Sequence, residues 1–311
     1  MIHYLRHIQI DKNRWDECIS ASINRKVYAF SWYLDLVCPG WDAMIEDDYV
    51  SVFPLTHHHK WAISYLFQPY FTQQLGIFSP DVLPESLVSE YIRAIPCRFR
   101  FVEIQLNSTN RFAGGEGKTA MRVNHELDLV PAYEKLAGKY SQNTRRNLQK
   151  ALEAGITLTR SIGVDELIAL FRENYGRKEG KLKDVNYATL RRLMVHGLDN
   201  NLGYITGAYT KQEILSAGAF FLFDQSRAYF LFAASAPEAR ENGAMFLLID
   251  RFIAENAGTK LILDFEGGND ANLGRFYKSF GAIEVDYQAL RIYRFSKVAE
   301  RGLYFVRKLW K

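Results

Sequence analysis

The sequence of 311 residues contains few cysteines and no long apolar run. The three cysteines, Cys18, Cys38 and Cys97, lie far apart and form no CxxC pair. Their spacing excludes a disulfide framework and a cysteine-based metal site, and it is typical of a reducing compartment. No stretch approaches about 18 uninterrupted apolar residues, which excludes a membrane-spanning helix. The first residues also lack the apolar core of a signal peptide, so we expect a cytoplasmic protein.

Positive and negative charges are also nearly balanced. Lysine and arginine number 39 against 35 acidic residues, and the formal net charge of +4 is compatible with an anionic ligand but does not predict nucleic-acid binding. No GxSxG elbow occurs, which disfavours a Ser-His-Asp hydrolase. In the run His57, His58 and His59, only the first and third share a strand face, and no cysteine or acid cluster is near. We therefore predict a solvated hairpin there and no metal site.

Apolar residues make up 48% of the chain, which is enough for a large core. The length favours two domains, and Pro131 marks a boundary between residues 130 and 141. The second half reads as a strand, two helices, three strands, a helix, a strand, a helix and a final extended stretch. This order predicts one mixed α/β sheet with a crossover helix. The first half has a similar but less clear order, which suggests a duplicated fold.

Several elements are marked by caps and apolar spacing. Ser141 precedes a basic helix that we expect to reach residue 154, and Asp270 caps a short helix that begins near Ala271. Other expected elements are strands over residues 2–10, 72–78, 101–106, 118–129 and 261–266 and helices over residues 12–22, 84–95 and 242–256.

Three segments of the second half resemble the GNAT N-acyltransferase superfamily. Residues 239–244, ARENGA, resemble the loop that binds the pyrophosphate of coenzyme A. The strand over residues 261–266 resembles the splayed strand that meets the pantetheine arm. Residues 276–281, FYKSFG, resemble the FYxxxGF motif of the family. The resemblance implies an acyltransferase fold in this half.

Two longer segments resemble a narrower branch, the Fem-type peptidyltransferases, which carry two such folds in tandem. These are the basic helix SQNTRRNLQKALEAG and the stretch DFEGGNDANLGRFYKSFGA. The resemblance implies an α/β (α+β mixed-sheet) protein with two tandem GNAT-like domains. We assign residues 1–130 to a degenerate first domain and residues 131–311 to a second, with a linking basic helix at 141–154.

The pattern departs from the family in two places. Met245 stands where the pyrophosphate loop normally has its second glycine or alanine. The first half has no recognisable phosphate loop, so only the second domain is expected to hold a donor.

Acyl transfer to an amine needs a positioned donor, stabilisation of the oxyanion and a proton for the leaving atom. Tyr277 stands at the position that resembles the family's acid, and a phenol can supply that proton. The alternative is a tyrosine that only packs its ring. Glu266 ends an apolar strand, where its carboxylate can accept the proton of the amine or hold a cationic substrate. It can equally cap the next helix or pair with an arginine.

The resemblance also implies a set of cofactor-binding residues. Arg240 and the amides of Gly243 and Ala244 would bind a phosphate at the start of a helix, where the helix dipole favours anions. An ordinary helix start is the alternative. Gly267 and Gly268 permit positive φ and a close approach of the backbone to a ligand, or serve only the turn.

Amides and an aromatic side chain are concentrated in the first half, around Pro69. Gln68, Tyr70, Gln73 and Gln74 can line a cleft for a sugar or peptide, because amides bond hydroxyl groups and rings stack on sugar faces. The alternative is a turn with buried, satisfied glutamines.

Arg145 and Arg146 on the basic helix are candidates for binding an anionic substrate such as a nucleotide-linked sugar. A solvated basic helix face is the alternative.

The sequence therefore predicts an N-acyltransferase that moves an acetyl, acyl or aminoacyl group to an amine by direct attack. The donor is acyl-coenzyme A or, if the Fem resemblance holds, an aminoacyl ester on tRNA. The acceptor is a small molecule or a compound like a peptidoglycan precursor. The competing prediction is an inactive scaffold that binds an envelope- or sugar-linked ligand or a protein partner.

Overall fold

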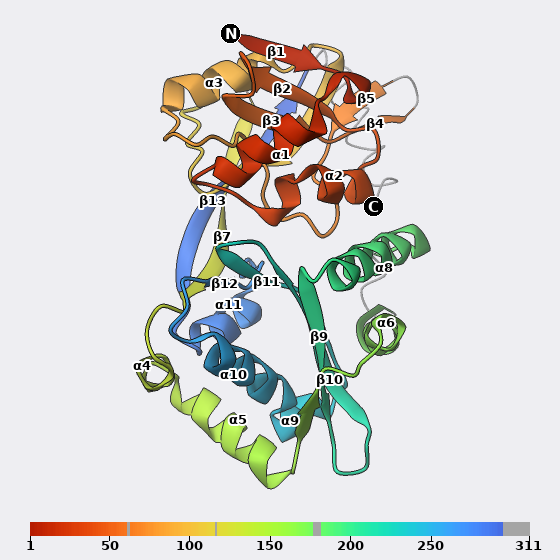
Figure 1. Ribbon diagram of the computed structural model, residues 1–311, viewed down its shortest axis with the longest axis vertical. Coiled ribbons are helices and arrows are strands. Elements are labelled where there is room, and N and C mark those ends of the chain that lie inside the picture. Colours follow the sequence, from red (N-terminus) through yellow and green to blue (C-terminus); the bar gives the residue numbers. More distant parts are fainter. Residues whose placement is uncertain (61–62, 116, 177–181, 295–311) are drawn as a thin grey trace. The chain divides into compact units, whose positions relative to one another are not determined.

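The computed structural model describes residues 1–60, 63–115, 117–176 and 182–294 (Figure 1). The described chain forms two compact units, one of residues 1–122 together with the residues from 286 on, the other of residues 123–285. Strands β7 (Lys118–Asp128) and β13 (Ile283–Tyr293) each contribute residues to both units. The domain ranges 1–130 and 131–311 stay a prediction, and residues 295–311 lie outside the described residues.

The first unit contains two sheets, with hydrogen-bonded orders β1-β2-β3 and β4-β5-β6-β13. Its core is apolar and includes Phe53, Tyr91 and Val102, all fully buried. Its elements are β1 (Ile2–Leu5), α1 (Lys12–Ala21), α2 (Ser31–Val37), β2 (Asp42–Glu46), β3 (Ser51–Leu55), β4 (His57–Lys60), β5 (Ile63–Leu66), α3 (Glu85–Ala94) and β6 (Phe99–Gln105), with 3₁₀ turns at His7–Gln9 and Val27–Ala29.

Two strands expected in this unit are wrong in extent. The strand expected over residues 2–10 ends at Leu5 and is followed by a 3₁₀ turn. The segment 72–78 forms only isolated bridges, from Leu75 to Leu106 and from Val52 to Phe78. Side-chain amides replace a ladder there: Asn110 accepts from the Ile77 N–H at 2.7 Å and donates to its carbonyl at 3.0 Å.

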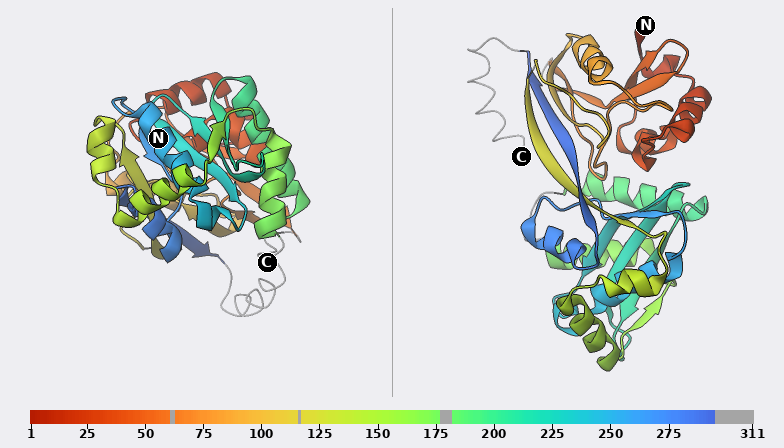
Figure 2. Two further views of the ribbon diagram at one scale, coloured as in Figure 1. Left: turned by 90° about the horizontal axis from the view of Figure 1, so that it is seen from below. Right: turned by 90° about the vertical axis from the view of Figure 1, so that its left-hand side faces the viewer.

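The second unit is a mixed sheet in the order β7-β12-β11-β10-β9-β8, in which only β11 and β12 pair in parallel. Helices α5, α10 and α11 lie on one face of this sheet and α6 and α8 on the other (Figure 1 and Figure 2). Its remaining elements are α4 (Tyr133–Gly138), α5 (Gln142–Glu153), β8 (Thr157–Thr159), α6 (Val164–Phe171), a π turn (Arg172–Gly176), α8 (Asp184–Asp199), β9 (Gly203–Tyr209), β10 (Leu215–Phe223), β11 (Arg227–Ser235), α9 (Ala239–Asn242), α10 (Ala244–Asn256), β12 (Ile262–Asp264) and α11 (Ala271–Lys278).

The parallel pair positions the candidate site. Helices α9 and α10 form the crossover from β11 to β12, and Leu263 and Phe252 meet in one core cluster. β12 pairs with β11 only up to Asp264, opposite Tyr229, whereas β11 runs on to Ser235. The two parallel strands therefore stop running together at this point, and the loop after β12 begins there.

The expected caps of the two flanking helices are present. The Ser141 hydroxyl accepts from the Thr144 N–H at the start of α5. The Asp270 carboxylate accepts from the Asn272 and Leu273 amides at the start of α11. Among the helices of the described residues, none combines the length and the apolar character needed to cross a bilayer.

Candidate active site

The loop between β12 and α11 is held by hydrogen bonds to its backbone. The Glu266 N–H donates to the carboxylate of Asp264 at 3.0 Å, and the Gly267 N–H donates to Asn124 Oδ1 at 3.0 Å. The Phe265 N–H donates to the carbonyl of His125, also at 3.0 Å. Glu266 adopts a left-handed conformation with φ at 54°, which a residue with a side chain rarely takes.

Tyr277 points its phenol at this loop. Its side chain is buried, and its ring stacks on Phe265 with centroids 4.6 Å apart. A methyl group added to Gly267 would lie 3.7 Å from the phenol oxygen and 3.4 Å from Cε2. Burial, and then the nearby Glu266 and Asp270 carboxylates, raise the pKa of Tyr277 well above its usual range. The phenol is therefore protonated at neutral pH, as a proton donor must be.

The structure thus brings Tyr277, Glu266 and Gly267 together at the end of β12. Gly268 adjoins them, but its small size serves packing: at φ 136°, an added methyl group would lie 2.0 Å from Nδ1 of His125. Gly268 therefore makes room for an imidazole as well as for the turn.

The predicted phosphate-binding residues lie at the junction of α9 and α10. Arg240 is exposed on α9. Gly243 has φ 72°, and its Cα faces the carbonyl of Asn147 so closely that a methyl group would lie 2.1 Å from that oxygen. The Ala244 N–H donates to Asn242 Oδ1 at 3.0 Å. A phosphate would have to displace the Asn242 side chain to reach this amide.

The surface beside this junction is acidic. A shallow cavity of about 530 Å³ carries three carboxylates against one ammonium group, so its lining has a net negative charge. Its lining consists of Lys150, Glu153, Ala154, Glu238, Glu241 and Asn242.

The two arginines of α5 are exposed and differ in their contacts. Arg145 donates to the carbonyls of Gly138 at 2.9 Å and Tyr140 at 3.3 Å, so it helps to terminate α4. Arg146 is exposed on the same helix. The Thr144 hydroxyl donates to the carbonyl of Ser279 at 2.9 Å, which docks the start of α5 on the end of α11.

The four substrate-binding candidates around Pro69 lie in the first unit. Gln68 donates to the Thr72 carbonyl at 2.9 Å and accepts from the Gln105 N–H at 3.0 Å. Gln74 accepts from the Ser108 N–H at 3.0 Å and donates to Gln73 at 2.7 Å. Tyr70 is 52% exposed. The amides of Gln68 and Gln74 therefore hold the backbone of this segment in place.

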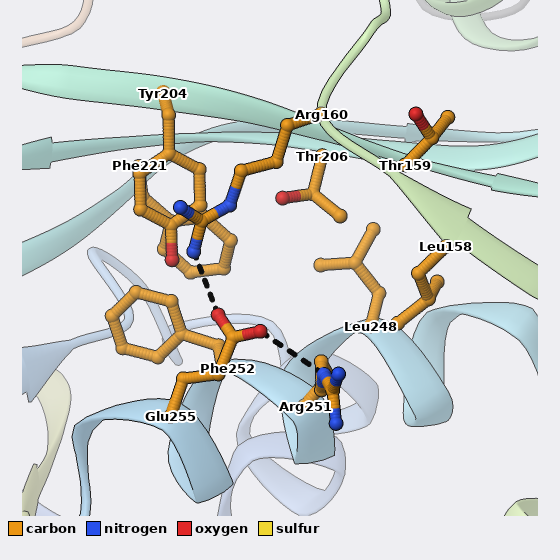
Figure 3. Close-up of a pocket in the computed structure, with 10 residues that line it drawn as sticks. All are labelled: Leu158, Thr159, Arg160, Tyr204, Thr206, Phe221, Leu248, Arg251, Phe252 and Glu255. Carbon is orange, nitrogen blue, oxygen red and sulfur yellow. Dashed lines mark hydrogen bonds and ion pairs between the residues drawn. The ribbon is translucent and has the colours of Figure 1, made fainter.

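A cavity of about 110 Å³ lies between α10 and strands β8 to β10 (Figure 3). Glu255 is paired with Arg160 at 2.7 Å and with Arg251 at 3.0 Å, and the Arg160 guanidinium lies 4.0 Å from the Tyr204 ring centroid (Figure 3). None of the residues that line it belongs to the Tyr277 loop. This cavity has room for only a small molecule and is separate from the candidate site.

Sequence reasoning missed Asn124 and His125, which hold the loop from β7. Neither belongs to a motif, and an Asn-His pair within a strand gives no local sign of function. Among the described residues, no group of three histidine, cysteine or acidic side chains is placed to hold a metal ion.

The segment that contains Tyr277 matches a known family. Residues 138–279 match the model described as the acetyltransferase (GNAT) domain. No curated protein matches the chain.

Solved structures resemble nearly the whole chain. FemX is 14% identical, over 93% of this chain and 97% of its own, with a TM-score of 0.64. A conserved protein of unknown function from Bacteroides thetaiotaomicron is 10% identical over 94% and 100%, with a TM-score of 0.62. The C-terminal domain of an Agrobacterium fabrum protein described as a lysylphosphatidylglycerol synthetase is 12% identical over 94% and 95%, with a TM-score of 0.54. At these identities the likeness concerns the fold.

Proposed function

We propose that this chain, which has the GNAT/Fem-like tandem fold with a GNAT domain at residues 138–279, is an N-acyltransferase that uses Tyr277 as its acid. One observation carries the proposal: the protonated phenol of Tyr277 lies against Gly267 and beside Glu266, where β12 ends. Ends of parallel strands are where open α/β sheets usually bind ligands.

The chemistry needs no covalent enzyme intermediate. The amine nitrogen attacks the donor carbonyl, a C–N bond forms, and the C–O or C–S bond to the carrier breaks. Tyr277 gives its proton to the departing oxygen or sulfur, and the Glu266 carboxylate takes the proton lost by the amine. Transfer of that proton back to the phenolate restores both residues.

Between the two donors, we propose the aminoacyl ester on tRNA. A thiolate with a pKa of about 8.5 leaves without much help, whereas an alkoxide requires a proton. A phenol whose pKa is raised far above 10 suits the alkoxide better. The acidic lining beside Gly243 also disfavours the pyrophosphate of coenzyme A. The acceptor we propose is an amine on a small molecule or on a cytoplasmic compound like a peptidoglycan precursor.

The test is transfer measured by mass spectrometry, with panels of aminoacyl-tRNAs, acyl-coenzyme A thioesters and amine acceptors. We expect product from an aminoacyl-tRNA, and we expect Tyr277→Phe to lower kcat about 100-fold, because a general acid typically contributes that much or more. The donor KM should change less than about threefold.

Tyr209→Phe is the matched control, because this half-buried residue of β9 bonds Glu166 far along the sheet from β12. It should leave kcat unchanged. A Tyr277→Phe variant with full kcat would contradict the acid role.

The second candidate is the inactive scaffold. The observation that favours it is the Asn242 side chain on the Ala244 amide, which fills the position predicted for a phosphate. A ligand that binds only the folded state raises the melting temperature. If neither class of donor raises it and no product forms, the scaffold is supported and the transferase is excluded.

A further inference from the structure

His125 has an environment that ordinary core packing does not explain. Its side chain is 1% exposed on β7, and Nδ1 lies 3.0 Å from the carbonyl oxygen of Gly267. A carbonyl oxygen only accepts hydrogen bonds, so Nδ1 carries the proton and donates it. Nε2 faces Glu284 at 3.9 Å, which is beyond hydrogen-bond range.

Two glycines also approach the imidazole closely. An added methyl group would lie 2.0 Å from Nδ1 at Gly268 and 3.2 Å from Cε1 at Gly274. The first distance is impossible, and the second is tighter than ordinary van der Waals contact. Both the loop and α11 therefore approach the ring as closely as glycine permits.

The segment held in this way is strained. Glu266 has φ at 54°, and a conformation of this kind persists only where the surroundings enforce it. Its own N–H is bonded to Asp264 within the strand end. The next residue, Gly267, is held from β7 at both of its backbone polar groups, its N–H by Asn124 at 3.0 Å and its carbonyl by His125.

We propose that His125, together with Asn124, is a positioning residue that keeps Gly267 against the phenol of Tyr277 and Glu266 in its left-handed conformation. The inference rests on the proposed acyl transfer for its consequence in catalysis. Both residues lie outside the segment 138–279 that matches the GNAT domain. The loop of that domain thus takes its shape from a strand that precedes it by 142 positions.

Two substitutions separate a hydrogen-bonding role from a packing role, because one keeps the N–H donor and the other keeps the side-chain volume. His125→Asn keeps an N–H donor near the position of Nδ1 but leaves part of the ring's volume empty. His125→Phe fills that volume and removes the donor. If His125 positions the loop, the Asn variant should keep kcat within about threefold and the Phe variant should lose about 30-fold, with the donor KM within twofold in both. If His125 only packs, the order is reversed, and that result would overturn the proposal.

A second measurement needs no activity. Hydrogen exchange read by mass spectrometry on peptides that cover residues 261–276 should be about tenfold faster at the loop amides in His125→Phe and close to wild type in His125→Asn. The melting temperatures of the variants identify any global unfolding. If His125→Phe does not fold, His125→Leu replaces it in both measurements.

The two ideas can fail separately. Absence of transfer by the wild type with every donor would reject the proposed function, while the exchange order would still decide the role of His125. Wild-type exchange in the Phe variant would reject the positioning role even if transfer is found.

Discussion

Glu266 combines an unfavourable backbone conformation with a candidate functional carboxylate. A non-glycine residue with φ near 54° costs of order 1–3 kcal/mol, and such strain tends to collect at active sites. The neighbouring residue, Gly267, is bonded at both its N–H and its carbonyl, as described above, which is how the fold maintains the strain. The backbone conformation that places the Glu266 carboxylate therefore lowers the stability of the fold.

Glu266→Gly should separate the two effects. Glycine accepts positive φ, so we expect the free energy of unfolding to stay level or rise by up to about 1 kcal/mol despite the extra entropy of the unfolded chain. Loss of the carboxylate should lower kcat at least tenfold. Urea unfolding and the transfer assay measure the two quantities. A loss of stability beyond about 1 kcal/mol would show that the carboxylate itself stabilises the fold. The control is Glu241→Gly, at an exposed site with negative φ, where glycine should be destabilising.

Single residues also mark the limit of sequence reasoning about the site. Tyr277 and Glu266 were found because they belong to a recognisable segment. They lie close together because only a short loop separates β12 from α11. Asn124 and His125 had no such signal, because a contact across 142 positions depends on which strand lies beside β12. The neighbour order in a sheet is set by the whole core and leaves no trace in a local pattern.

At the scale of elements, helix α10 contains a partly buried acid, Asp250. Tyr133 of α4 donates to Asp250 at 2.9 Å, which ties the two helices together. Burial raises the pKa of Asp250, and the bond from Tyr133 only partly offsets it. A carboxyl whose pKa is raised on folding binds protons more tightly in the folded state. Its ionisation at neutral pH therefore reduces stability, which is regained as the pH falls through the raised pKa.

Asp250→Asn should consequently stabilise the protein at pH 7. Asparagine can still accept the Tyr133 bond without carrying charge, and we expect a gain of up to about 1 kcal/mol, because the site is only partly buried. The gain should shrink at acidic pH, as the wild-type carboxyl is protonated through its raised pKa. Urea unfolding at pH 7 and at acidic pH tests this, with the exposed Asp286→Asn as control. Destabilisation at pH 7 would show that the charge strengthens the helix contact.

Elements with their own caps and turns were predictable, and those stabilised by distant amides were not. Helices α5 and α11 begin where Ser141 and Asp270 indicated. The segment 72–78 has the composition of a strand, yet Asn24, Asn107 and Asn110 bond the backbone of Ile77 or Ser79 in place of a neighbouring strand. These amides come from two other parts of the chain, so no window around residue 75 contains them.

At the scale of the whole chain, the matched segment and the compact unit differ in extent. The GNAT match covers residues 138–279, whereas the unit covers residues 123–285. Residues 123–137 supply Leu127, Leu129 and Leu136 to the core. They also supply Glu126, which pairs at 2.8 Å with Arg227, whose side chain is only 16% exposed.

A fragment of residues 138–279 should therefore not fold cooperatively. It loses three core leucines and leaves β12 without its neighbour β7, and breaking a buried ion pair typically costs about 3–5 kcal/mol. A fragment of residues 123–285 retains these partners and should unfold in one transition. Near-ultraviolet circular dichroism during urea unfolding compares the two. Cooperative unfolding of the shorter fragment would show that β7 is dispensable for the core.

The contact between His125 and the Gly268–Gly274 pair also restricts recombination between relatives. A chimaera that takes only the matched segment from one parent receives the two glycines but not the His125 imidazole that packs against them. An imported segment with alanine in place of Gly268 would collide with the imidazole, and alanine in place of Gly274 would crowd it. Exchange of this half between homologues should succeed only when the crossover point lies upstream of residue 124, so that His125 and the two glycines come from the same parent.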